Sequence, residues 1–132
     1  MNDQMQKRLN LLLNGFRITE ECSSELLDIL NRSGLEEDFF ISFKTRIKQL
    51  DRFKHNVIKY IPDGFEKLKN ASGLYSMRIK LKKNIRIIYG YNGNELLLLA
   101  FEERAGKRSS DYTNKIEIAK HRLEKIKKER RR

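Results

Sequence analysis

Residues 74–101 read LYSMRIKLKKNIRIIYGYNGNELLLLAF, and this stretch decides the fold. Its first part alternates polar and apolar residues, as a strand with one buried face does, and the apolar positions are Tyr75, Met77, Ile79 and Leu81. The other face of this strand is polar and basic, because it carries Ser76, Arg78 and Lys80. The link at 82–84 is long enough for a hairpin but too short for a parallel crossover.

Two further strands follow in the same stretch. Residues 85–91 are rich in the β-branched and aromatic residues that favour strands. The Asn-Gly step at 92–93 favours a tight hairpin turn. The unbroken apolar run at 96–101 is typical of a central strand that is covered on both faces. The stretch therefore predicts a small, twisted antiparallel sheet built as a three-strand meander.

Two helices are predicted before the meander. A short one carries Leu26, Leu27 and Leu30, begins at a cap formed by Thr19, Ser23 or Ser24, and ends at residues 31–34. A longer one begins at Glu36, has a break near residues 51–54, and is stopped by the Pro-Asp-Gly sequence at 62–64. Its apolar residues recur at helical spacing: Phe39, Phe40, Phe43, Ile47, Leu50, Val57 and Ile58.

A last helix is predicted after the meander, capped by Ser110 or Asp111. Its apolar stripe should pack on the sheet and consists of Tyr112, Ile116, Ala119, Leu123 and Ile126. The basic end of the chain, with residues 127–132 as its tail, is expected to fray.

The N-terminal residues allow two interpretations. Residues 1–18 can form a helix with Met5, Leu9, Leu12 and Leu13 on one face, or residues 11–18 can form a strand at the edge of the meander. We favour the edge strand. The fold class is then α+β, in one domain spanning residues 1–132, with residues 1–34 either part of the fold or an N-terminal extension.

Composition limits the class of partner. A net charge of +11 and a pI near 9.9 indicate a polyanionic partner, which is either nucleic acid or an acidic protein. The single cysteine, Cys22, excludes an intrachain disulfide and offers no zinc-type cluster. No apolar run approaches the length of a membrane span, so a cytoplasmic protein without a membrane partner is expected.

The order of several short segments from Leu68 to Leu123 resembles one known family. The segments are Lys67-Leu68-Lys69, Gly73-Leu74-Tyr75 with Arg78, Arg86-Ile87-Ile88-Tyr89, Phe101-Glu102-Glu103-Arg104, and Ile116, Ala119 and Arg122. Together they resemble the RelE/ParE superfamily of toxins from type II toxin–antitoxin pairs, especially its HigB-like and phage-derived branch. The resemblance covers under half of the chain tightly. It implies a twisted antiparallel sheet with two helices packed on one side.

The resemblance also implies an activity. Members of this group are mRNA interferases, endoribonucleases that cleave messenger RNA on the ribosome and are held in check by a cognate antitoxin. They make the RNA 2′-hydroxyl attack the neighbouring phosphate and need no metal or other cofactor. The expected partners are therefore an antitoxin protein and ribosome-bound messenger RNA.

Several residues match the family's site. Arg86 matches its arginine in the strand before the Tyr89 position, and Arg78 matches a basic position on the preceding strand. Arg104 or Arg108 takes the place of the basic residue after the third strand, and Tyr112 that of the C-terminal tyrosine. The surrounding positions expected to contact RNA are Ser76, Lys80, Lys82, Lys83 and Lys107. Ser76 departs from the family, in which this position is commonly basic.

The chemistry sets conditions on the two arginines. Attack on a phosphodiester builds negative charge, which the planar fork of arginine can stabilise. An odd number of loop residues places Arg78 and Arg86 on one face of the hairpin, whereas a two-residue loop places them on opposite faces. Ribonuclease function requires that they converge and are not paired with carboxylates of their own chain. The general base stays open among a tyrosine, a lysine of lowered pKa, Glu102 and Glu103.

Two other functions remain open. A ParE-like inhibitor of DNA gyrase would share the fold but lack the catalytic cations. A non-catalytic module would use the basic face only to bind nucleic acid or an acidic partner, and its affinity for RNA would depend strongly on salt.

Overall fold

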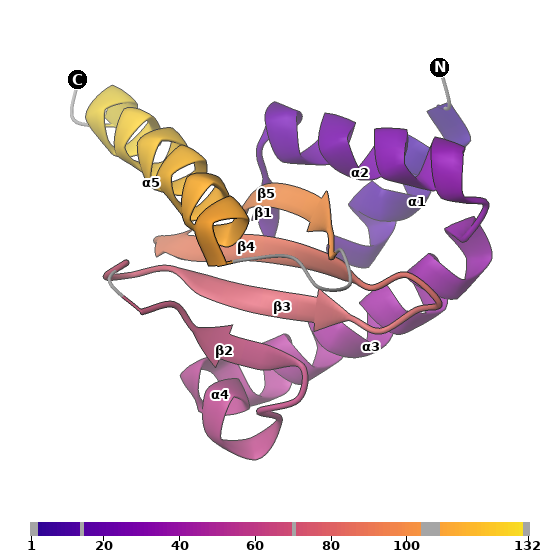
Figure 1. Cartoon of the computed structure of the whole chain (residues 1–132), viewed down its shortest axis with the longest axis horizontal. Coiled ribbons are helices and arrows are strands. Elements are labelled where there is room, and N and C mark those ends of the chain that lie inside the picture. The colour runs from indigo at the N-terminus through magenta and orange to yellow at the C-terminus, as the bar shows by residue number, and fades with distance from the viewer. Residues whose placement is uncertain (1–2, 14, 70, 104–108, 131–132) are drawn as a thin grey trace.

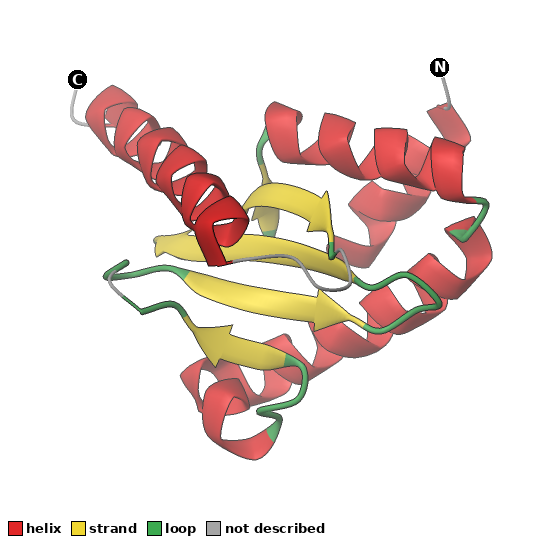
Figure 2. Cartoon of the chain, in the orientation of Figure 1, coloured by secondary structure: helices red, strands yellow, loops and turns green. Residues whose placement is uncertain are grey.

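The computed structural model describes residues 3–13, 15–69, 71–103 and 109–130 of the α+β fold that the sequence predicts (Figure 1, Figure 2). The elements run in the order α1 (Asp3–Leu13), β1 (Arg17–Ile18), α2 (Glu20–Ser33), α3 (Glu36–Phe53), the 3-10 turn η1 (Lys54–Asn56), α4 (Val57–Tyr60), β2 (Phe65–Lys67), β3 (Tyr75–Ile79), β4 (Ile85–Asn92), β5 (Asn94–Glu102) and α5 (Ser109–Arg130).

The sheet has the strand order β1-β5-β4-β3-β2. The pairs β3–β4 and β4–β5 are antiparallel, so the predicted meander is confirmed. At one edge β2 pairs antiparallel with β3, and at the other β1 pairs parallel with β5. The sequence did not predict β2, because three residues are too few to display an alternating pattern.

Helices cover both faces of the sheet. Helices α1, α2 and α3 share one apolar core with one face, whereas α5 packs on the other face through Ala119 and Leu123. Figure 1 shows α5 in front of the sheet and α3 behind it. The leucine run of β5 divides accordingly, with Leu97 in the first core and Leu98 in the second. The strand is therefore covered on both faces, as predicted, but the helices are not confined to one side as the resemblance implies.

The N-terminal segment combines the two interpretations. Residues 11–13 belong to α1, so the predicted strand is wrong there, whereas Arg17–Ile18 do pair with the edge of the sheet. Residues 3–13 form a helix because Met5, Leu9 and Leu13 recur every four residues and lie on one face, which is buried in the core shared with α2 and α3. Residues of α1 and α2 thus lie in the same core as the sheet.

The ends of the helices follow local chemistry. Thr19 caps α2 by accepting a hydrogen bond from the backbone N–H of Cys22 at 3.0 Å, and Gly34 ends this helix in the left-handed region. The predicted break lies at Lys54, which has a φ of 52°.

Helix α5 continues to Arg130, so the fraying predicted for residues 127–130 is wrong, while 131–132 lie outside the described residues. Lysine and glutamate are good helix formers, which explains the longer helix.

Helix α5 is also tied to α2 across the edge of β5. Arg122 pairs with Glu25 of α2 at 2.9 Å and donates to the backbone oxygen of Leu98 at 2.8 Å.

No helix in the described part of the chain is both long and apolar enough to cross a bilayer.

We expect Phe39→Ala to lower the free energy of unfolding by about 3–5 kcal/mol, because it empties a buried aromatic site. The ring is 0% exposed and lies 5.1 Å from Phe43 and 5.3 Å from Phe40, centroid to centroid. Urea denaturation measures the change. Ile41→Ala is the control on the same helix, because Ile41 is 68% exposed and its loss should change stability by about 0.5 kcal/mol or less. Equal losses in the two variants would contradict this account of the core.

Candidate functional site

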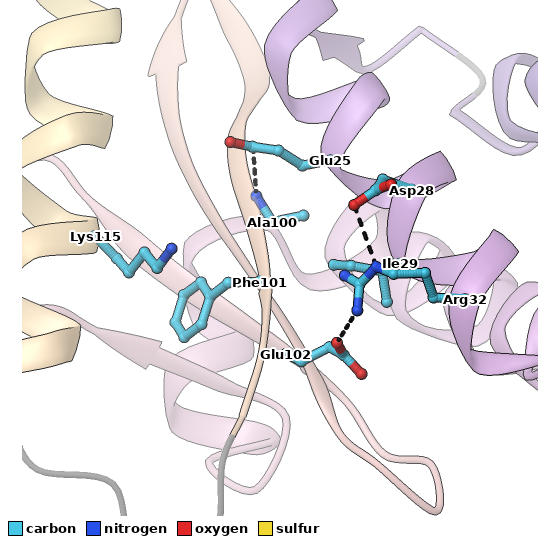
Figure 3. Close-up of a pocket in the computed structure, with 8 residues that line it drawn as sticks. All are labelled: Glu25, Asp28, Ile29, Arg32, Ala100, Phe101, Glu102 and Lys115. Carbon is cyan, nitrogen blue, oxygen red and sulfur yellow. Dashed lines mark hydrogen bonds and ion pairs between the residues drawn. The ribbon is translucent and has the colours of Figure 1, made fainter.

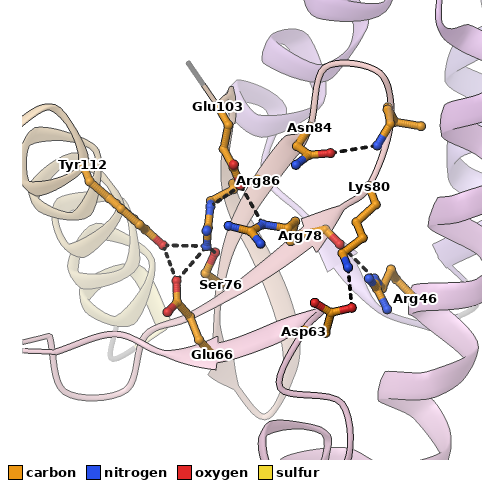
Figure 4. Close-up of polar contacts among 11 residues, drawn as sticks. Arg46, Asp63, Glu66, Ser76, Arg78, Lys80, Asn84, Arg86, Glu103 and Tyr112 are labelled. Carbon is orange, nitrogen blue, oxygen red and sulfur yellow. Dashed lines mark hydrogen bonds and ion pairs between the residues drawn. The ribbon is translucent and has the colours of Figure 1, made fainter. Parts of the chain in front are cut away.

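Arg78 and Arg86 lie directly opposite each other on β3 and β4. Residues 80–84 separate the two strands, an odd number, so both side chains leave the same face of the sheet. The two side chains converge on Glu103, whose Oε2 accepts a hydrogen bond from Nε of Arg78 at 2.8 Å and from Nε of Arg86 at 2.6 Å (Figure 4). The condition that the two arginines converge on one face of the hairpin is therefore met.

Glu103 is held in this position by the backbone. It follows the last residue of β5, and its N–H donates to the backbone oxygen of Asn84 at 2.9 Å. Burial by itself raises the pKa of the Glu103 carboxyl, but the hydrogen bond from Arg78 and the positive charges of both arginines outweigh burial and lower the pKa. Glu103 is therefore ionised at neutral pH.

The other side of Arg86 meets a second carboxylate and two hydroxyl groups. Its Nη1 lies 2.6 Å from Oε1 of Glu66, 3.3 Å from Oγ of Ser76 and 3.5 Å from the hydroxyl of Tyr112. The hydroxyl of Tyr112 in turn donates to Oε1 of Glu66 at 3.2 Å. We call the six residues of this group the Arg86 cluster: Glu66, Ser76, Arg78, Arg86, Glu103 and Tyr112.

Arg86 is the centre of the cluster and its side chain is only 14% exposed. Burial opposes its positive charge, but Tyr112, Glu103 and Glu66 outweigh burial, so the pKa of the guanidinium is raised. Arg86 therefore stays charged throughout the pH range in which proteins fold.

Tyr112 lies in the first turn of α5 and both packs and reaches the cluster. Its ring is 5.6 Å from that of Phe101, and the guanidinium of Arg86 lies 5.4 Å from the ring centre. Burial raises the pKa of the Tyr112 hydroxyl, an effect that a hydrogen bond with Ser76 and the charge of Arg86 only partly oppose. Tyr112 therefore carries a proton at neutral pH, and the raised pKa makes it a weaker acid than a free tyrosine.

A hollow of about 90 Å³ opens beside the two arginines. The start of β2 lines one side of this hollow, and β3 and β4 line the other, through Pro62, Asp63, Gly64, Phe65, Glu66, Ser76, Arg78 and Arg86. The cluster is thus open to a small external group.

The structure brings together only some of the predicted site residues. Ser76 and Tyr112 join the arginines, as described above. Lys80 directly follows β3 and pairs with Asp63, while Lys82 and Lys83 are exposed in the turn before β4. The remaining three predicted residues lie outside the described residues: Arg104, Lys107 and Arg108.

Of the two glutamates considered as a base, only Glu103 reaches the arginines. Glu102 points to a separate hollow of about 270 Å³ between α2 and β5, where it pairs with Arg32 at 3.2 Å (Figure 3). Arg32 also pairs with Asp28 at 3.3 Å, so the acidic groups of that hollow are partly neutralised within the chain.

Sequence reasoning missed Glu66. This residue is opposite Ser76 in the β2–β3 pairing, which places it on the face of the arginines. No local pattern marks a strand of three residues, so the sequence held no signal for this position.

The condition that the two arginines are free of carboxylates from their own chain is not met. Both arginines pair with carboxylates of their own chain, and the two positive charges of Arg78 and Arg86 are matched by the two negative charges of Glu66 and Glu103. The basic face that the sequence predicts is therefore electrically balanced at this point. Any phosphate that binds here must compete with these carboxylates or share the arginines with them.

No protein-family model, curated protein or solved structure matches the chain. The resemblance to the RelE/ParE superfamily accordingly stays a prediction from the residues that carry it, and the function is inferred from the geometry of the Arg86 cluster.

Proposed function

We propose that the protein is the toxin of a type II toxin–antitoxin pair, a cytoplasmic, metal-independent endoribonuclease that cleaves messenger RNA on the ribosome. The pairing of both arginines with carboxylates departs from the condition set from the sequence, but it also places a candidate base beside the cation. The observation that carries the proposal is that Arg86 is held between Glu103 on one side and Tyr112 and Glu66 on the other (Figure 4). Attack by a 2′-hydroxyl needs a cation for the developing charge, a base and an acid. The Arg86 cluster contains candidates for all three.

Glu103 is the proposed base and Tyr112 the proposed acid. The 2′-oxygen bonds to phosphorus while its proton passes to the Glu103 carboxylate. The bond from phosphorus to the 5′-oxygen breaks, and this oxygen takes the proton of the Tyr112 hydroxyl. The products are a 2′,3′-cyclic phosphate and a 5′-hydroxyl end. Such a displacement puts the attacking and leaving oxygens in line, and Glu103 and Tyr112 contact different nitrogens of Arg86.

Arg78 offers further donors to the phosphate. Its bond to Glu103 uses Nε, and no hydrogen bond to another described residue engages its two Nη groups. A guanidinium binds phosphate through two such parallel N–H groups. Its side chain is 31% exposed, so the phosphate can reach it without a rearrangement of the sheet.

Expression in bacteria tests the proposal. Induced protein should arrest growth, and primer extension should map cuts in messages that are being translated. The new ends should carry a 2′,3′-cyclic phosphate. Normal growth in the presence of folded, antitoxin-free protein would contradict the proposal.

A second candidate is a non-catalytic RNA-binding module. The observation that favours it is the neutralisation of both arginines by Glu66 and Glu103, since a site built to stabilise new negative charge gains from unpaired cations. In this case the net charge of +11 would supply most of the affinity, and binding would weaken steeply with salt.

Glu103→Gln separates the two candidates. If Glu103 is the base, the variant should cleave about 10²-fold more slowly, yet bind RNA more tightly because both arginines lose a negative partner. If the protein only binds RNA, affinity should rise in the same way and neither protein should cleave. Single-turnover cleavage on stalled ribosomes and the anisotropy of labelled RNA measure the two effects.

The control for this variant is Glu102→Gln. It removes the same charge one residue earlier, where the carboxylate pairs with Arg32 and not with the cluster. Both RNA affinity and cleavage should stay within about twofold of the wild type, as for most surface substitutions. Cleavage by Glu103→Gln at the wild-type rate would exclude Glu103 as the base.

A further inference from the structure

A second group of cations lies at the far end of β3 from Tyr112. We infer that Arg46 and Lys80 form a second phosphate subsite beside Arg78, which holds the phosphate of the nucleotide next to the one that is cleaved. Arg46 comes from α3, a helix that carries no residue of the Arg86 cluster. The identity of the ligand as RNA rests on the proposed function, whereas the anion site itself rests on the contacts that follow.

Arg46 is fixed where β2 begins. Its Nε donates to the backbone oxygen of Arg78 at 2.8 Å, and its Nη1 donates to Oε1 of Gln49 at 3.0 Å. Its guanidinium also lies 5.7 Å from the centre of the Phe65 ring. A Cβ at Gly64 would lie 2.3 Å from Cζ of Arg46, so only glycine lets the guanidinium lie against the backbone here. The charge is therefore held in one place before any ligand binds.

The charge of Arg46 lacks an ion-pair partner of its own. Among the described residues, no carboxylate lies within 4.0 Å of its guanidinium, and the nearby Asp63 pairs with Lys80. Burial lowers the pKa of Arg46, Asp63 raises it, and the like charge of Arg78 lowers it further. Charged groups that leave water are normally paired. A half-buried guanidinium without a carboxylate is therefore suited to pair with an anion from outside.

The surroundings carry an excess of positive charge. Lys80, Arg46 and Arg78 all lower the pKa of Asp63, with the hydrogen bond from Lys80 as the largest cause. Across this group and the Arg86 cluster, the four cations Arg46, Arg78, Lys80 and Arg86 face three carboxylates, Asp63, Glu66 and Glu103, which leaves one net positive charge. Figure 4 shows Arg46, Lys80 and Asp63 on the opposite side of Arg78 from Tyr112.

The spacing fits a single strand of RNA. Lys80 lies two residues after Arg78, directly beyond the end of β3. Two residues of extended chain span roughly 6.6 Å. This is close to the separation of successive phosphates in an extended single strand. An RNA that places one phosphate between Arg78 and Arg86 and runs along β3 would bring the next to Lys80 and Arg46.

Arg46→Gln tests the subsite. The probe is a labelled tetrauridylate with 2′-deoxy sugars, which cannot be cleaved, and a set of analogues in which one phosphate at a time is replaced by an uncharged methylphosphonate. Dissociation constants come from fluorescence anisotropy. We expect Arg46→Gln to weaken binding roughly tenfold, as for a lost charge-assisted hydrogen bond. One methylphosphonate should weaken binding to the wild type by a similar factor and leave binding to Arg46→Gln unchanged.

The matched control is Arg52→Gln, which removes the same charge from an exposed position in the last turn of the same helix. If Arg46→Gln loses no more affinity than this control, the subsite is disproved. The same holds if each methylphosphonate weakens the wild type and Arg46→Gln equally. Thermal denaturation checks that Arg46→Gln is folded. If it is not, Lys80→Gln replaces it, since its side chain is 49% exposed, and the same pattern of losses is required.

The outcome is separable from that of the proposed function. A wild-type protein that binds the probe with the expected pattern but never cuts messenger RNA would retain the subsite and overturn the ribonuclease proposal. Cleavage on the ribosome without any selective loss at one phosphate would retain the ribonuclease and overturn the subsite. A wild-type protein that does not bind the probe overturns the subsite as well.

Discussion

Replacing Arg86 with glutamine should slow cleavage of ribosome-bound messenger RNA by about 10²–10³-fold, the usual effect of removing one donor to a developing oxyanion. The guanidinium contacts both Glu103 and Tyr112, so its loss also separates the base from the acid. Induction of the variant should no longer arrest growth. Single-turnover cleavage and the growth curve after induction measure the effect.

Two further variants show whether the loss of activity comes from the missing contacts of Arg86 or merely from the missing positive charge. Arg52→Gln removes the same charge from an exposed position and should still arrest growth. Arg86→Lys keeps the charge but cannot contact Glu103 and Glu66 through separate nitrogens, so it should recover only part of the activity. Urea denaturation tests whether each variant is folded. Growth arrest by folded Arg86→Gln at the wild-type level would remove the cluster from the mechanism.

Replacing Tyr112 with phenylalanine should slow cleavage by about 10²-fold or more, because it removes the proton donor to the leaving oxygen. The phenylalanine ring keeps the contact with Phe101, so α5 should stay packed on the sheet and the melting temperature should change little. Tyr60→Phe is the control, because Tyr60 is an exposed residue of α4. Full activity of Tyr112→Phe would mean that this ring only packs.

The pH dependence supplies an independent test of the same two groups. The base must be ionised, and the pKa of Glu103 is lowered from 4.5, so activity should fall only as pH drops below about 4.5. The acid must be protonated, and the pKa of Tyr112 is raised from 10.0, so activity should fall only as pH rises above about 10. Between these limits the rate should be flat. A titration near neutral pH would point to a different acid or base.

Much of the fold follows from local pattern. The alternation from Tyr75 to Ile79 and the Asn-Gly step before β5 predict the meander, because both depend on residues that are neighbours in the chain. Whether Arg78 and Arg86 share a face stayed open, because it depends on the length of the loop, which the structure places at residues 80–84. The predicted N-terminal strand was wrong for residues 11–13 and right for Arg17–Ile18, and the predicted fraying of residues 127–130 was wrong. Tertiary burial of Met5 and Leu9 and the helical propensity of the lysine-rich end decided those segments.

The sequence predicted the arginines and Tyr112 of the candidate site, but it did not predict which carboxylates contact them. Glu66 is 20 residues from Arg86, and Glu103 is 17 residues from it. Nothing in the local sequence indicates that these carboxylates converge on one guanidinium. The balance of charge at the cluster arises from this convergence.

By itself, the sequence determined the antiparallel hairpin and the basic character of the chain, because strand period and net charge are properties of residues in order. The structure decided that the two arginines share a face, because it gives the hairpin a loop with an odd number of residues. Only the tertiary structure decided which groups meet those arginines. Ion pairs between distant segments depend on where the sheet and α5 bring the backbone together, and the alternation of residues along the sequence does not predict those contacts.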